Sequence, residues 1–312
     1  MFNSTHTLVG LAIARTGLDE WVPRAAITAV IASNLPDIDI IADLSSMPSY
    51  LEQHRGITHS LVGIPLLSLL LAGAMYVFTR SFWRTFVVAL LAMATHPVLD
   101  FSNTYGLRPF LPFDGAWYYG DTLFIIDPIM DLILLLGIIA GEFFKKARWV
   151  MSFAALVLVL LYVGTRINAR NEAQAHLDSY TARVADFERS AVLPRLMDLW
   201  TWDGIVETKD SIFKVNIDTT QGVGKEVARM PRGQTTEIIS NAAKAPSAAA
   251  ILEFARFPVT RIQGLQFGYR VTFLDFRFFD EANKTSIFVA EVQLDNGMHI
   301  VKDTLVANVT ID

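Results

Sequence analysis

Long apolar runs fill the first half of the chain, and short alternating patterns fill the last third. A membrane-spanning helix needs about 17–25 mostly apolar residues. Four runs meet this requirement: Leu61–Thr79, Thr85–Phe101, Leu123–Gly141 and Trp149–Thr165. Two shorter runs precede them: His6–Ala14, extended to about Leu18, and Val22–Leu35. The pattern predicts an all-α polytopic membrane domain of about six helices over residues 1–166.

The pattern changes after the last apolar run. Residues 167–190 are polar and helix-permissive, and they predict a helical stalk that continues the sixth helix. Beyond them, β-branched and aromatic residues alternate with polar ones, as they do in strands. The expected strands are Trp202–Glu207, Ser211–Asp218, Gly268–Phe276, Ser286–Leu294 and His299–Ala307. Asp295-Asn296-Gly297 is a hairpin turn signal, and Ala248–Phe257 predicts a short helix. We therefore expect a small, β-rich α+β domain over residues 191–312.

Composition supports a protein that is part membrane-embedded and part soluble. Of the 312 residues, 52% are hydrophobic and only 18% are charged, and the mean hydropathy is +0.38. A soluble domain typically carries about 25% charged residues. A net charge of -5 offers no basic excess for binding phosphates, so we expect no nucleic-acid partner. The chain has no cysteine, which excludes disulfides and thiolate metal sites.

Basic residues in the short loops indicate an orientation, because such loops stay in the cytoplasm. The strongest cluster is Lys145, Lys146 and Arg148. With six helices, the other basic loops fall on the same side: Arg15 with Arg24, and Arg80 with Arg84. We therefore predict an integral, multi-pass protein of the plasma or inner membrane. Both ends of its membrane domain, and hence the C-terminal domain, would be extracytosolic.

Histidine and aspartate gather at the ends of the predicted helices. The positions are His6, Asp37, Asp39, His54, His59, His96, Asp100, Asp127 and Asp131. In the six-helix topology they all fall at one membrane face. Because that topology rests on lysine and arginine alone, the convergence independently supports a shared site. His96 and Asp100 are four residues apart and therefore share a helix face, as do Asp127 and Asp131.

A bound cation would explain this layer of ionisable groups. Each such group costs about 2.5–3.5 kcal/mol inside a membrane on insertion scales. Histidine nitrogen and carboxylate oxygen suit Zn²⁺, with Mn²⁺ or Fe²⁺ as alternatives. A catalytic site keeps one coordination position open for water, which ionises near neutral pH and becomes a nucleophile.

Several of these residues also have a purely structural interpretation. His6 suits a helix cap or an interfacial position. Asp37 and Asp39 follow a proline and suit a cap or a turn. Asp127 precedes a proline and suits an N-cap. The other four are harder to explain without a shared polar site: His54, His59, His96 and Asp100.

Four further residues complete the predicted site. Arg55 and Arg108 are candidates for clamping a phosphate through bidentate hydrogen bonds. For Arg108, an interfacial anchor is an equally good interpretation. We expect Thr58 and Asp131 to orient the metal ligands through hydrogen bonds.

Several motifs resemble those of a known family. The motifs are Thr5-His6-x-x-x-Gly10, Leu35-Pro36-Asp37-x-Asp39, His54-Arg55-Gly56-x-Thr58-His59-Ser60 and His96-x-x-Leu99-Asp100. They resemble the YdjM-type family of membrane-bound, metal-dependent hydrolases, and the likeness extends over about residues 1–165. The loop Tyr105–Phe113 and the segment Phe124–Pro128 also fit this family.

The family is distantly similar to zinc-dependent phospholipase C and P1-type nucleases, which are all-helical phosphoesterases with clustered zinc ions. The resemblance implies hydrolysis of a phosphoester. It also implies metal ligation by His6, Asp37, Asp39, His54, His59, His96 and Asp100. The membrane setting favours a lipid or lipid-linked substrate over a nucleic acid.

The leading hypothesis is a hydrolase in which metal-activated water attacks phosphorus. Asp39 or Asp127 would accept the proton, and Arg55, with Arg108, would neutralise charge on the phosphoryl oxygens. One alternative is a metal that only staples the helices. Another is ion- or proton-coupled transport or sensing, against which the apolar stretch Leu66–Met75 argues. The C-terminal domain shows no catalytic motif and suits substrate capture, a lid or a protein partner.

Overall fold

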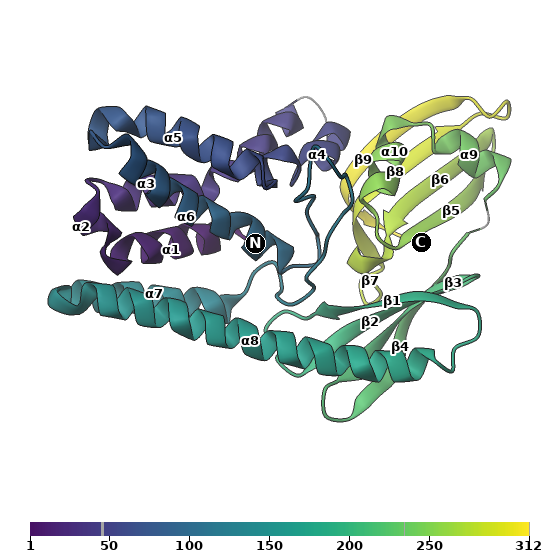
Figure 1. Ribbon diagram of the computed structural model, residues 1–312. Helices are drawn as coiled ribbons and strands as arrows, with labels where there is room; N and C mark the ends of the chain where they lie inside the picture. Colours follow the sequence, from purple (N-terminus) through teal and green to yellow (C-terminus); the bar gives the residue numbers. More distant parts are fainter. Residues whose placement is uncertain (45–46, 234, 312) are drawn as a thin grey trace. The chain divides into compact units, whose positions relative to one another are not determined.

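The computed structural model describes residues 1–44, 47–233 and 235–311 (Figure 1). They form two compact units. The first unit contains Met1–Asp39, Arg55–Glu172 and Leu193–Thr201. The second contains Ile40–His54, Ala173–Val192 and Trp202–Asp312. Residues 40–54 therefore cluster with the C-terminal strands, although they lie inside the predicted domain 1–166.

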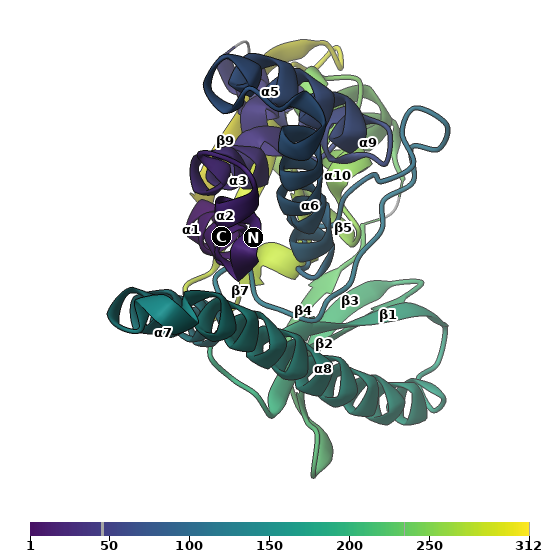
Figure 2. The same ribbon diagram turned by 60° about the vertical axis from the view of Figure 1, so that its left-hand side comes forward.

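The first unit is helical, as the apolar runs predict. Its main helices are α1 (Asn3–Ile13), α3 (Ala25–Asn34), α5 (Gly63–Thr79), α6 (Phe82–Phe101), α7 (Pro128–Phe143) and α8 (Arg148–Thr181). A π-helical turn η1 (Ala14–Leu18) and the short α2 (Asp19–Trp21) follow α1. The 3-10 segments are η2 (Leu35–Leu44), η3 (Ile57–His59) and η4 (Lys145–Ala147), and α4 covers Met47–Gln53. Helices α7 and α8 run side by side (Figure 2).

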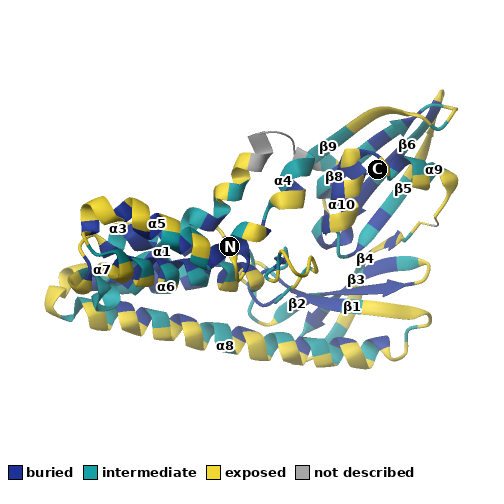
Figure 3. Cartoon of the chain, turned by 45° about the horizontal axis from the view of Figure 1, so that its top comes forward, coloured by how far each residue is buried: buried dark blue, intermediate teal, exposed yellow. Residues whose placement is uncertain are grey.

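Small side chains bring the helices of this bundle close together. Ala25, Ala29 and Ala32 of α3 are fully buried against Ala89 and Ala92 of α6. Small residues at such contacts let helix backbones approach closely. The outward faces of α5, α6 and α8 instead carry large exposed apolar side chains (Figure 3), including Leu70, Leu91 and Leu160. A contiguous apolar surface of this kind is typical of a protein that meets lipid.

Two helices among the described residues are long and apolar enough to cross a membrane, Phe82–Phe101 and Lys145–Thr181. The number becomes three if Pro48–His59 counts together with Gly63–Thr79 as one broken span. The remaining helices are shorter, with 11 residues in α1, 10 in α3 and 16 in α7. The described residues thus contain two candidate membrane spans, and the full six-span topology stays a prediction. Helix α8 continues without a break to Thr181 and so covers the first part of the predicted stalk. The last residues of the predicted 167–190 stalk are not helical, because strand β1 begins at Phe187.

The second unit is rich in β-structure, as predicted. One sheet has the order β1-β2-β3-β4, formed by β1 (Phe187–Pro194), β2 (Thr201–Thr208), β3 (Ser211–Asp218) and β4 (Gly222–Pro231). The other has the order β5-β6-β8-β7, with β9 paired to β8. Its strands are β5 (Pro258–Leu265), β6 (Gly268–Asp275), β7 (Phe279–Asp280), β8 (Thr285–Leu294) and β9 (Ile300–Thr310), with η5 (Phe276–Phe278) before β7.

Two short helices cover the second sheet, α9 (Glu237–Ala242) and α10 (Pro246–Phe254). Their core contains Ile251 from α10 and Phe273 from β6, both buried. The expected hairpin turn joins β8 to β9, where Gly297 N donates to Asp295 Oδ1 over 2.8 Å. The backbone N–H of His299 also donates to this carboxylate, and it holds the pKa of Asp295 below its ordinary value.

Candidate metal centre

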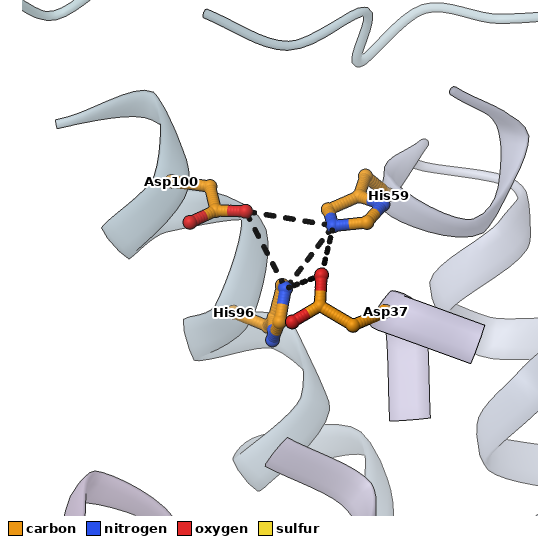
Figure 4. A group of neighbouring side chains, drawn as sticks. All are labelled: Asp37, His59, His96 and Asp100. Carbon is orange, nitrogen blue, oxygen red and sulfur yellow. Dashed lines mark hydrogen bonds and ion pairs between the residues drawn. The ribbon is translucent and has the colours of Figure 1, made fainter. Parts of the chain in front are cut away.

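Four predicted ligands meet in one cluster of the first unit (Figure 4). Helix α6 supplies His96 and Asp100, which lie one turn apart and face the same way. The 3-10 turn η3 supplies His59 just before α5, and η2 supplies Asp37 just after α3. The described ligand atoms of these four residues all lie within 4.8 Å of one another.

The spacing of the four atoms fits tetrahedral coordination. Nε2 of His59 and Nε2 of His96 lie 3.1 Å apart. Asp37 Oδ1 is 3.4 Å from the first nitrogen and 3.3 Å from the second. Asp100 Oδ2 is 3.5 Å and 3.4 Å from the same two nitrogens. Zinc bonds of about 2.0–2.1 Å give tetrahedron edges of roughly 3.3–3.4 Å. Five of the six edges therefore lie close to those of a zinc site.

Hydrogen bonds at the far nitrogens orient both rings. His96 Nδ1 lies 2.7 Å from the Ser33 carbonyl, which can only accept, so this nitrogen carries the proton. His59 Nδ1 lies 3.0 Å from Thr58 Oγ1 and 3.4 Å from Asp39 Oδ2. Both Nε2 atoms then face the cluster with lone pairs, as in metal sites with oriented histidines. Two lone pairs 3.1 Å apart repel each other unless a metal ion or a shared proton lies between them.

Burial strengthens the case for a cation. His59, His96 and Asp100 are at most 1% exposed, whereas the Asp37 side chain is 18% exposed and marks the open side. A buried carboxylate is costly without a positive partner. Asp100 Oδ1 receives Arg55 Nη2 over 3.3 Å, and the amino group of Met1 also contacts this oxygen. Asp100 Oδ2 is left facing the two histidines.

His6 lies next to this group. Its ring stacks on that of His96, with centroids 3.7 Å apart, and its Nε2 is 3.5 Å from Asp100 Oδ1. The residue is fully buried, and neither ring nitrogen makes a hydrogen bond. Leaving buried polar atoms unsatisfied is costly. The arrangement therefore suits a metal contact by His6 on the side of Asp100 Oδ1, whereas the four-residue cluster uses Asp100 Oδ2.

The comparisons with known proteins identify the first unit. The family model described as YdjM inner membrane protein matches residues 1–173. The chain belongs to the YdjM family. A second model, the YfhP C-terminal alpha/beta plait domain, matches residues 237–306. The chain is 23% identical over 311 residues to "Uncharacterized protein YfhP" of Bacillus subtilis (strain 168), covering 96% of this chain and 93% of that protein. No solved structure matches.

These findings confirm part of what the motifs predict. The YdjM resemblance is right, and the inner-membrane family agrees with the apolar helices. The plait match agrees with the β-rich second unit. The comparisons do not support the distant likeness to phospholipase C and P1 nuclease, which stays a hypothesis.

Besides His6, two predicted ligands of this YdjM-family chain stand outside the four-residue cluster. Asp39 Oδ2 accepts the Thr58 hydroxyl over 3.1 Å and the Arg55 backbone N–H over 3.0 Å. It therefore braces the turn that carries His59. His54 belongs to the second unit, where its ring stacks on Tyr50 at 4.6 Å. A ligand role for either residue stays a prediction.

The two predicted arginines lie beside the loop that follows α6. Arg55 Nη1 donates to Asn103 Oδ1 over 2.9 Å, while its Nη2 contacts Asp100. The guanidinium of Arg108 lies 4.8 Å above the Trp117 ring, and its backbone N–H donates to the Arg55 carbonyl over 3.2 Å. Asn103 was not foreseen from the sequence. In the sequence, the one feature that could have indicated it is a polar residue shortly after an apolar helix.

Asp127 and Asp131 hold helices together. Asp127 Oδ1 caps α7 by accepting from Met130 N over 3.0 Å, and Oδ2 accepts the Tyr162 hydroxyl over 2.8 Å. The N-cap interpretation of Asp127 is therefore confirmed. Asp131 Oδ1 accepts the Thr5 hydroxyl over 2.7 Å, which ties α7 to α1 next to His6. The contact is with Thr5 rather than with a ligand ring, so the orienting role of Asp131 stays a prediction.

Proposed function

We propose that this chain is a membrane-bound, metal-dependent hydrolase that cleaves a phosphoester of a lipid or lipid-linked substrate. The observation that carries the proposal is the group of four ligand atoms at tetrahedral spacing, with both histidines oriented through their far nitrogens. A closed structural site for zinc commonly uses thiolates. This one uses histidine and carboxylate, the donor set of catalytic zinc sites. Because four protein ligands complete a tetrahedron, a water would have to join as a fifth ligand or replace Asp37, the most exposed of the four.

His59, His96, Asp37 and Asp100 would hold the metal, which we take to be Zn²⁺, with Mn²⁺ or Fe²⁺ as alternatives. When bound, such an ion acidifies a coordinated water and supplies a hydroxide nucleophile near neutral pH. Asp37 is the most exposed ligand, so water and substrate would approach on its side.

Arg55 is the residue best placed to meet a phosphoryl group. Its guanidinium already lies 3.3 Å from Asp100 Oδ1, and Asn103 fixes its other nitrogen. A guanidinium held in this way can stabilise charge that develops on phosphoryl oxygens. Arg108 would contribute through the same loop, since its backbone is bonded to that of Arg55.

The contacts favour positioning roles for Asp39 and Asp127, the two residues considered as proton acceptors. Asp39 braces Thr58 and His59, whereas both oxygens of Asp127 accept hydrogen bonds from α7 and α8. Asp37, the most exposed of the four ligands, is then the carboxylate best placed to receive a proton from an incoming water. The likeness to phospholipase C and P1 nuclease remains a hypothesis about reaction type.

Metal content is the first test. Wild type purified in detergent should hold a stoichiometric divalent metal, measured by elemental mass spectrometry. His59→Ala and Asp100→Asn should each lose it, because each removes one of four ligand atoms. Asp114→Asn is a matched control, since Asp114 lies in an exposed loop and its hydrogen bonds within the described residues are to Ala116 and Tyr118. Metal-free wild type that is folded and resists reloading would refute the proposal.

Turnover separates catalysis from a metal that only joins helices. Metal-loaded protein should hydrolyse phospholipids in nanodiscs, and Arg55→Ala should lower turnover while metal stays bound. If every coordination position is taken by protein, no turnover will occur even with full occupancy. That result would favour the non-catalytic interpretation. Metal-independent ion flux in proteoliposomes would favour transport.

We also propose six membrane spans with the C-terminal domain outside the cytosol. The support is the distribution of basic loops in the sequence, together with the apolar outer faces of the helices. The domain would then share the compartment of the metal centre, where it could bind substrate or a protein partner.

A further inference from the structure

An apolar cavity of about 560 Å³ adjoins the metal centre within the first unit. His59 belongs to both, because its Nε2 faces the cluster while the residue also lines the cavity. Ligand sites commonly have volumes of about 300–1,000 Å³ and mostly apolar walls with a few polar groups. Among the lining residues, His59 is also a member of the metal cluster.

One face of α6 forms the wall of this cavity. Leu90, Ala94, Val98 and Phe101 follow one another at helical spacing and all line it. The metal ligands His96 and Asp100 lie on a different face of the same helix. The opposite wall comes from Ile64 and Pro65 at the start of α5, and from Leu107, Pro109 and Phe110 in the loop after α6.

The cavity opens toward a face that carries exposed apolar side chains. Ile64 and Leu107 at its floor are buried, whereas Leu61 is 66% and Val98 is 64% exposed at its rim. Phe101 and Phe110 are also exposed there. Helix α6 is long and apolar enough to span a membrane, and in a bilayer the exposed apolar rim on α6 would face lipid hydrocarbon. A chain from the bilayer can enter without crossing water.

We propose that this cavity binds a fatty acyl chain of a membrane phospholipid and thereby places the phosphoester at the metal centre. The proposal rests on the proposed hydrolase function for its substrate, and it adds the place and chemistry of binding. A water-soluble phosphoester has no group to fill such a cavity. Preference for long acyl chains is the expected consequence, since each buried methylene adds to affinity.

Ala94→Trp should fill the cavity, because Ala94 is the smallest residue on its α6 wall. Leu91→Phe is the matched control: Leu91 is on the same helix, is 49% exposed and does not line the cavity. Ala94→Val is a milder change that guards against misfolding of the Trp variant. Metal content should stay at the wild-type level in all three variants.

The binding test uses full-length protein in nanodiscs that contain a phosphatidylcholine with a photoreactive diazirine on one acyl chain. We expect crosslinks to concentrate on peptides that contain Leu61–Pro65 or Leu90–Phe101. Ala94→Trp should lower this labelling about tenfold, the effect of displacing roughly two buried methylenes. Ala94→Val should lower it less, and Leu91→Phe should leave it unchanged. Labelling that spreads evenly over all lipid-facing helices, or that Ala94→Trp leaves intact, would overturn the proposal.

A parallel assay compares hydrolysis of long-chain phosphatidylcholine with that of p-nitrophenyl phosphate. Ala94→Trp should lower turnover of the lipid only. Equal loss of both activities would contradict a chain-binding role. If no phosphoester is hydrolysed at all, the proposed function fails, while the crosslinking result still decides whether the cavity binds acyl chains.

Discussion

At the residue scale, the metal site depends on the candidate ligands and equally on the hydrogen bonds that orient their side chains. Thr58 Oγ1 donates to Asp39 and lies 3.0 Å from His59 Nδ1. This hydroxyl therefore connects the carboxylate to the ring that it helps to orient. Partners of this kind commonly change metal affinity by about 10–100-fold when they are removed.

Thr58→Val should weaken metal binding within that range of about 10–100-fold, because the ring loses its orienting partner. Competition with a chromogenic chelator measures the change, and Thr58→Ser should restore affinity. Thr165→Val is the matched control, since Thr165 is exposed and its hydroxyl donates to the Tyr162 carbonyl of its own helix. Wild-type affinity in Thr58→Val would show that Asp39 alone orients His59.

The sequence identified the members of the cluster but not their division of labour. His59, His96, Asp37 and Asp100 were all named from position and chemical type. Motif spacing could not show that Asp39 faces the far side of the imidazole while Asp37 faces the near side. That distinction depends on how η2 turns after α3, which residue types alone do not specify.

At the element scale, close contact between α1 and α3 sets the position of one ligand. A Cβ added at Gly10 would lie 2.5 Å from Ser33 Oγ and 2.7 Å from the Ala29 carbonyl. The carbonyl of the same Ser33 accepts the His96 Nδ1 proton. Helix packing at Gly10 is therefore connected to ring orientation through one residue.

Gly10→Ala should lower the free energy of unfolding by about 1–3 kcal/mol through overpacking, and it should also weaken metal binding. Gly164→Ala on α8 is the control, because nothing lies within 4 Å of its added Cβ. There alanine should be neutral or stabilising by about 0.5–1 kcal/mol. Thermal unfolding in detergent, with and without chelator, measures both effects. Equal stability of the two variants would contradict the close packing of α1 on α3.

The start of α7 tests the two interpretations of Asp127. Asparagine ranks with aspartate as an N-cap, so Asp127→Asn should keep both stability and lipid turnover. Asp127→Ala should lower the free energy of unfolding by about 0.5–2 kcal/mol through loss of the cap. If Asp127 is instead the proton acceptor, Asp127→Asn will be stable but inactive. Melting temperatures and turnover of the two variants decide between these roles.

The strands show which segments the local sequence pattern predicts and which it misses. Ser211–Asp218 is predicted with the bounds that the structure gives to β3. Strands β1, β4, β5 and the two-residue β7 were not predicted. β4 contains two glycines and many exposed side chains, and half of the β5 residues are exposed. These segments are strands because neighbouring strands supply their hydrogen bonds, as β6 does along the whole of β5.

At the scale of the whole molecule, one family match covers mainly helical structure and the other covers β-rich structure. The YdjM match covers residues 1–173, and the plait match covers residues 237–306. The metal cluster and the apolar cavity both belong to the first unit. The chemistry that we propose therefore needs no residue of the plait domain, which leaves that domain available for substrate capture or a partner.

Membrane topology is testable because the chain has no cysteine. Single cysteines placed at the exposed Asn296 and Lys146 report on the β8–β9 turn and the basic loop. A membrane-impermeant maleimide should label Asn296→Cys in intact cells, and Lys146→Cys only after permeabilisation. The reverse pattern would place the C-terminal domain in the cytosol and overturn the proposed orientation.

The sequence by itself determined the helical first half, the β-rich end and the residue types of the metal cluster. It could do so because hydrophobic periodicity and local motifs act over a few residues. Only the tertiary structure decided which atoms meet. Asp37, His59 and His96 are far apart along the chain, and they converge because small residues bring α1, α3 and α6 together. The cavity beside His59 likewise exists only where the loop after α6 folds back onto α5, where Leu61 N donates to the Pro109 carbonyl. Contacts between such distant segments depend on packing, which no local pattern encodes.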